Sequence, residues 1–197
     1  SDLPSMVAAL ANSPPSDRDR TVAMIFEAYA ESDLQAAWNL ALSTQNPTTR
    51  RSALRAVISS LAATNPEQAL ALAQSLKERD LRQYSKIVAL SSLAARDPAR
   101  AFALATQQGE EDAGQFQLTP VLVQWARKDM QAAMAAAATL KGKQAEQAQA
   151  AIVSAMTRED PRAAWDYATK LARPGGDSGW NDPRTQVIRE WAQVDPA

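Results

Sequence analysis

Apolar residues recur along the chain with the three- and four-residue spacing of helices, and this pattern returns about every 32 residues. Residues that suit a helix N-cap stand at corresponding places, separated by 32, 32, 32, 31 and 35 residues: Asp33, Asn65, Asp97, Asp129, Asp160 and Asp195. Proline, which is tolerated at the first helical position, directly follows four of them, as Pro66, Pro98, Pro161 and Pro196. The spacing predicts that a short helix begins after each cap.

These short helices share an alanine pair at positions i and i+4, beside a column of large apolar residues. The pairs are Ala37/Ala41, Ala69/Ala73, Ala101/Ala105, Ala133/Ala137 and Ala164/Ala168. The large residues are Trp38, Leu70, Phe102, Met134 and Trp165. Because residues four apart share a helical face, the small side chains are expected to let a neighbouring helix approach closely.

A second helix in each repeat carries apolar residues at positions p, p+1 and p+4. The triplets are Ile25/Phe26/Tyr29, Val57/Ile58/Leu61, Ala89/Leu90/Leu93, Val121/Leu122/Trp125, Ile152/Val153/Met156 and Val187/Ile188/Trp191. Six hairpins then account for the chain, at approximately 1–32, 33–64, 65–96, 97–128, 129–159 and 160–194. The pattern predicts an all-α fold, a right-handed α–α superhelix (solenoid) of six antiparallel hairpins in a single domain, 1–197.

Some positions depart from the repeat or stand at its ends. Both ends of the chain fall at the start of a repeat, so we expect a segment of a longer protein, with Trp191 facing the place of a further hairpin.

The tryptophans on repeat positions are expected in the core: Trp38, Trp125, Trp165 and Trp191. Trp180, in the long connection 171–184, lies outside the pattern. Pro120 is expected to begin a fresh helix or to kink an existing one.

Tandem hairpins that close on Trp-Ala or Leu-Ala and then Asp-Pro resemble known helical repeats. Examples are Leu93-Ala94 before Asp97-Pro98 and Trp191-Ala192 before Asp195-Pro196. The pattern is similar to tetratricopeptide-like repeats, more loosely to HEAT-like α-solenoids, and to alanine-rich helical repeats of bacterial proteins. Here the unit has 32 residues, whereas the tetratricopeptide unit has about 34. The resemblance implies scaffolding or peptide binding in a groove rather than chemistry.

The composition narrows the chemistry that the chain can perform. It has no histidine and no cysteine, so the commonest general base, the thiolate nucleophile and the commonest metal ligands are missing. Its 21 Lys+Arg balance 22 Asp+Glu, which gives no bulk attraction to nucleic acid. The acidic cluster Glu110, Glu111 and Asp112 is interpreted as a turn before a helix. We therefore expect no enzyme, cofactor or metal, and no membrane insertion in this segment.

A basic column is the strongest candidate for binding. Arg18, Arg50 and Arg82 occupy equivalent positions at the starts of second helices, and Arg51, Arg55 and Lys86 are close by. A cation near a helix N-terminus is electrostatically unfavourable. The presence of these arginines there suggests a binding function, such as holding an acidic peptide or an anionic glycan. The alternative is a set of surface arginines paired with nearby acids: Asp17, Asp19, Glu78 or Asp80.

These features predict a non-enzymatic scaffold that binds a protein or peptide, as part of a larger bacterial envelope protein. One alternative is a small-ligand or glycan-binding sensor that uses Trp180 and its long loop. Another is the non-catalytic superhelical part of a peptidoglycan-processing enzyme such as a lytic transglycosylase. The Ala- and Gln-rich composition without cysteine favours a periplasmic or envelope-associated protein, with a cytoplasmic location as the alternative.

Overall fold

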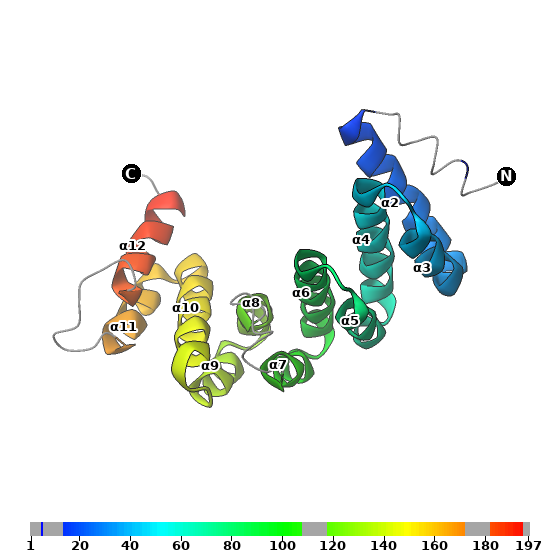
Figure 1. Ribbon diagram of the computed structural model, residues 1–197. Coiled ribbons are helices and arrows are strands. Elements are labelled where there is room, and N and C mark those ends of the chain that lie inside the picture. Colours follow the sequence, from blue (N-terminus) through cyan, green and yellow to red (C-terminus); the bar gives the residue numbers. More distant parts are fainter. Residues whose placement is uncertain (1–4, 6–13, 108–117, 172–181, 195–197) are drawn as a thin grey trace. The chain divides into compact units, whose positions relative to one another are not determined.

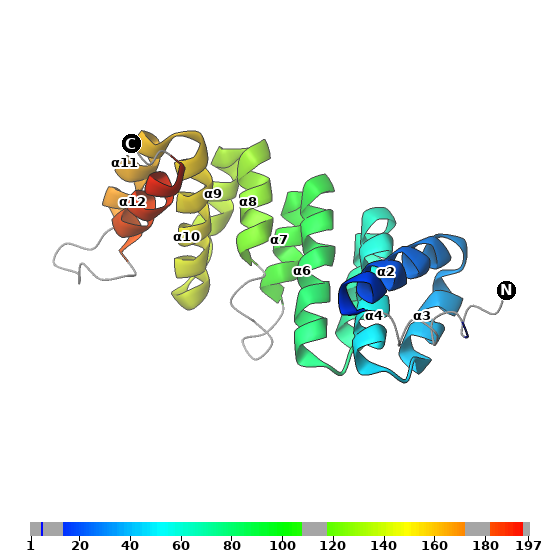
Figure 2. The same cartoon turned by 90° about the horizontal axis from the view of Figure 1, so that it is seen from above.

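The computed structural model describes residues 5, 14–107, 118–171 and 182–194 (Figures 1 and 2). Regular structure in these ranges is entirely α-helical, which confirms the all-α prediction. The chain divides into two compact units, Ser1–Leu93 and Ala94–Ala197, each described here by itself. A single superhelix through all six repeats stays a prediction. Asp195 and Pro196 lie outside the described residues.

The first unit alternates long and short helices. It contains α2 (Pro15–Ser32), α3 (Leu34–Ser43), α4 (Pro47–Thr64), α5 (Pro66–Ser75) and most of α6 (Arg79–Arg96). The long helices have 18 residues each and the short ones have 10. Helices α2 and α4 lie side by side, α3 contacts both, and α5 packs against α4 (Figure 1). Long and short helices thus alternate in this unit, as a two-helix repeat requires.

The second unit contains α7 (Pro98–Gln107), α8 (Leu118–Lys128), α9 (Met130–Ala138), α10 (Gly142–Glu159), α11 (Pro161–Leu171) and α12 (Pro183–Val194). Helix α8 packs against α7, α9 and α10, and α10 packs in turn against α9, α11 and α12. Pro120 falls in the first turn of α8, so it belongs to the start of a fresh helix. A missing N–H is tolerated there because first-turn amides have no intrahelical partner.

The predicted caps join consecutive helices through a single residue. In Asp33, Asn65, Asp97, Asp129 and Asp160, the side-chain oxygen accepts a hydrogen bond from the backbone N–H three residues later, at 2.9 to 3.1 Å. The backbone N–H of four of these residues also donates to the carbonyl four residues earlier: Asp33, Asn65, Asp129 and Asp160. One residue thus closes one helix and opens the next, so a single-residue connection links the two helices.

The alanine pairs lie in the buried core of the helical packing. All ten of these alanines are buried: Ala37, Ala41, Ala69, Ala73, Ala101, Ala105, Ala133, Ala137, Ala164 and Ala168. The triplets Val57/Ile58/Leu61 and Ala89/Leu90/Leu93 are also buried throughout. Burial of small residues four apart on each short helix supports the interpretation that neighbouring helices approach closely along these faces.

The tryptophans do not share one environment. Trp38 is buried, and Trp125 is half-buried with its ring 5.8 Å from that of Phe102 in an edge-to-face arrangement. Trp165 and Trp191 are 41% and 50% exposed, so the prediction that they are core residues was wrong, although Trp191 was also expected to have one side that faces the place of a further hairpin. The repeat position of a tryptophan does not predict its burial, because a neighbouring helix must also cover that position.

Candidate functional site

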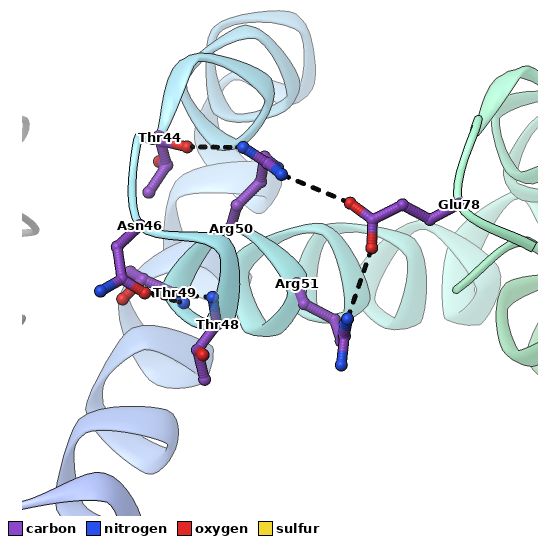
Figure 3. A network of polar contacts seen from close by, with 7 residues as sticks. All are labelled: Thr44, Asn46, Thr48, Thr49, Arg50, Arg51 and Glu78. Carbon is purple, nitrogen blue, oxygen red and sulfur yellow. Dashed lines mark hydrogen bonds and ion pairs between the residues drawn. The ribbon is translucent and has the colours of Figure 1, made fainter. Parts of the chain in front are cut away.

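The predicted basic column begins with arginines that bond to backbone carbonyls. Arg50, in the first turn of α4, donates from Nη1 to the carbonyl of Thr44 at 3.3 Å (Figure 3). Arg82, in the first turn of α6, donates from Nη1 to the carbonyls of Leu76 at 2.6 Å and Lys77 at 3.2 Å. Thr44 and Leu76 are the C-cap residues of α3 and α5. The two arginines, 32 residues apart, therefore make equivalent hydrogen bonds to the end of the preceding helix in successive repeats.

This arrangement changes the electrostatic interpretation of the column. The last carbonyls of a helix lack intrahelical partners and form its negative end, which a cation stabilises. The connections from α3 to α4 and from α5 to α6 are only three residues long, so an arginine at the start of the second helix reaches back to the end of the first. Arg50 and Arg82 thus have a structural role that does not require a ligand.

Glu78 pairs with two of the three arginines on α4. Its Oε1 lies 3.5 Å from Nη2 of Arg50, and its Oε2 lies 3.6 Å from Nη2 of Arg51 (Figure 3). Asn46 supports the same corner by accepting hydrogen bonds from the backbone N–H groups of Thr48 and Thr49, both at 3.0 Å. The Glu78 contacts agree with the alternative that some of these arginines pair with nearby acids. Because the Arg51 side chain stays 54% exposed, this pairing leaves most of it open to solvent.

Arg55 and Tyr84 form the contact that the sequence did not predict. The guanidinium of Arg55, on α4, lies 4.3 Å from the ring centroid of Tyr84, on α6, in a cation–π arrangement. Both side chains are exposed. Arg51 and Arg55 are four residues apart and so share a face of α4. We call Arg51, Arg55 and Tyr84 the α4–α6 surface.

The other predicted residues lie elsewhere. Lys86 is only 2% exposed, at a position that is apolar and buried in other repeats: Val22, Leu54 and Leu118. It is therefore not part of the exposed surface. Arg18 is half-buried on α2, and its backbone N–H donates to the carbonyl of Pro14 at 2.9 Å. Trp180 lies outside the described residues, as do Glu110, Glu111 and Asp112.

Charge is segregated within the described part of the first unit. Every Lys and Arg in residues 14–93, including the buried Lys86, lies in a connection before α4 or α6 or in the first three turns of α2, α4 or α6. Some acids share this end: Asp17, Asp19, Glu78 and Asp80. In residues 14–93 the charged residues outside this end are all acids: Glu27 and Glu31 on α2, the cap Asp33, and Glu67 at the start of α5. Beyond residue 93, α6 ends on a basic residue, Arg96. The α4–α6 surface therefore stands at the cationic end of this unit.

A separate ion pair fixes the start of α12 in the second unit. Arg184 donates from Nη2 to Oδ2 of Asp182 at 2.6 Å and from Nε to both carboxylate oxygens at 3.0 and 3.1 Å. The backbone N–H of Arg184 also donates to Oδ1 of Asp182. These hydrogen bonds hold the pKa of the Asp182 carboxyl below its usual range.

The lowered pKa of Asp182 predicts an acid-dependent loss of stability. A carboxyl whose pKa is lower in the folded state stabilises it above the unfolded pKa of about 3.9, and this contribution disappears as pH falls through the folded value. We expect the melting temperature of the native chain to exceed that of Asp182→Asn near neutral pH. The difference should shrink below about pH 4. A difference that stays constant from neutral to strongly acidic pH would contradict the assignment.

No match for this chain came from comparison with protein-family models, with curated proteins or with solved structures. Within the described ranges, no helix has both the length and the apolar character that crossing a bilayer requires. In the same part of the chain, acidic side chains do not gather in groups of three or more that could hold a metal ion.

Proposed function

We propose that the chain is a non-enzymatic binding module that holds an acidic peptide segment of a partner protein on the α4–α6 surface. The observation that carries the proposal is the exposed Arg55–Tyr84 stack beside Arg51, at the cationic end of the first unit. Stacking on Tyr84 restrains the guanidinium of Arg55 while leaving its N–H donors available to a carboxylate. Arg50 and Arg82 support this surface by fixing the helix ends behind it.

The proposed architecture around this surface is the right-handed α–α superhelix of six antiparallel hairpins. The caps and buried alanine pairs support it, since they recur in the five short helices that the structure describes. We further propose that the module belongs to a larger bacterial envelope protein, on the strength of its resemblance to bacterial helical repeats and its composition without cysteine. A scaffold binds its partner through a complementary surface and needs no catalytic side chain. This requirement suits a chain without histidine or cysteine.

The proposal predicts binding of a fluorescein-labelled glutamate-rich peptide, measured by fluorescence anisotropy. The double variant Arg51→Gln, Arg55→Gln is expected to bind about tenfold more weakly, which is about 1.4 kcal/mol. Arg162→Gln, the same change at an exposed arginine on α11, is the matched control and should bind as the native chain does. Raising the ionic strength should weaken binding, because exposed charges are screened.

Tyr84 offers a second, conservative comparison. Tyr84→Phe keeps the ring beneath Arg55 and should bind the peptide normally, whereas Tyr84→Leu removes the ring and should weaken binding. Equal affinity for the glutamate-rich peptide and for a peptide with glutamine in place of every glutamate would show that charge does not drive recognition. That result would overturn the proposed function.

A further inference from the structure

Glu78 places a carboxylate of the chain itself against the α4–α6 surface. It lies in the connection between α5 and α6, and its side chain extends to two arginines of α4 (Figure 3). Its Oε1 lies 3.5 Å from Nη2 of Arg50, and its Oε2 lies 3.6 Å from Nη2 of Arg51. A carboxylate of this chain therefore already occupies a position beside Arg51 that an acidic side chain of a bound peptide would need.

Glu78 stands at a helix start where Asn46 stands one repeat earlier, 32 residues before it. The carbonyl of each residue accepts a hydrogen bond from the backbone N–H four residues later, at 2.9 Å. The side chain of Asn46 also caps its own helix. Asparagine is among the favoured N-cap residues and glutamate is not. The longer acid at this position instead reaches the arginines of the preceding repeat.

The contacts of Glu78 are of a kind that a ligand can displace. Both distances exceed the roughly 2.8 Å of a strong charge-assisted hydrogen bond. The side chains of Glu78 and Arg51 are 40% and 54% exposed, and exposed pairs contribute little to stability because water competes for both charges. The hydrogen bond from Arg50 to the carbonyl of Thr44 does not involve Glu78. Glu78 can therefore leave Arg51 while Arg50 stays fixed to the end of α3.

We propose that Glu78 is an internal competitor for the carboxylates of the acidic peptide. Its side chain occupies the position on Arg51 that a peptide carboxylate takes, and it leaves that position when the peptide binds. Only the fraction of molecules in which Arg51 is released can bind fully, so the competition lowers the apparent affinity of the surface. This inference rests on the proposed function, because it concerns the same surface.

The variant Glu78→Gln tests the proposal in the anisotropy titration with the fluorescein-labelled glutamate-rich peptide. It should bind about threefold more tightly than the native chain, because a weak exposed pair no longer has to be broken. The gain should be lost in the Arg51→Gln background, where the guanidinium for which the two carboxylates compete is absent. Asp80→Asn, which removes the same charge in the first turn of α6, should give a smaller gain. The helical circular dichroism of Glu78→Gln should match that of the native chain.

Three results would overturn the inference while leaving the proposed function intact. Unchanged or weaker peptide binding by Glu78→Gln would show that Glu78 does not compete. A gain of the same size in the Arg51→Gln background would show that the competition is not for Arg51, and an equal gain from Asp80→Asn would show that only the overall charge matters. If neither the native chain nor Glu78→Gln bound the peptide, the proposed function would be overturned, and this inference with it.

Discussion

Phe26→Ala is expected to lower the free energy of unfolding by about 3–5 kcal/mol. Phe26 is among the largest fully buried side chains and lies at position p+1 of α2, a helix that packs against α3 and α4. Removing its ring deletes apolar contacts and leaves a cavity that the surrounding helices can only partly fill. Urea denaturation followed by circular dichroism measures the change.

Met24→Ala on the same helix is the matched control. Met24 is exposed, so truncating it should change the free energy of unfolding by no more than about 0.5 kcal/mol. Comparable losses at the two positions would mean that the p, p+1 and p+4 pattern does not mark the packed side of α2.

Ala69→Leu is expected to destabilise the chain by about 1–3 kcal/mol through overpacking. Ala69 is fully buried on α5, where a larger side chain would push the helix away from its neighbours. Ala71→Leu, at an exposed alanine of the same helix, makes the same chemical change without the steric conflict. If Ala71→Leu were as destabilising as Ala69→Leu, the alanine pair would not be a site of close approach.

The local rules of the repeat could be predicted because they depend on neighbours in sequence. A cap followed by proline specifies where α5, α7 and α11 begin, and the structure places those helix starts where the sequence predicts. Alanines four apart share a face in any helix, so their burial followed from spacing alone. The exposure of Trp165 could not follow in this way, because it depends on what covers that position, whereas Trp191 was expected to face the place of a further hairpin.

The candidate site was predicted only in part, since it depends on contacts between repeats. Arg50 and Arg82 were recognised as equivalent, but their bonds to the ends of α3 and α5 required the geometry of the short connections. Tyr84 was missed, although its position outside the p, p+1 and p+4 triplet was a usable signal. The burial of Lys86 was also detectable, because a step of 32 residues in either direction reaches a leucine: Leu54 and Leu118.

Hydrogen exchange with and without the glutamate-rich peptide tests most directly whether the α4–α6 surface is the binding site. Exchange can be read for every part of the chain at once, so the result locates the contact as well as detecting it. The account predicts slower exchange in the first three turns of α4 and of α6, around Arg51, Arg55 and Tyr84, with α10 unchanged. Slower exchange confined to the second unit, or no change anywhere at saturating peptide, would contradict it.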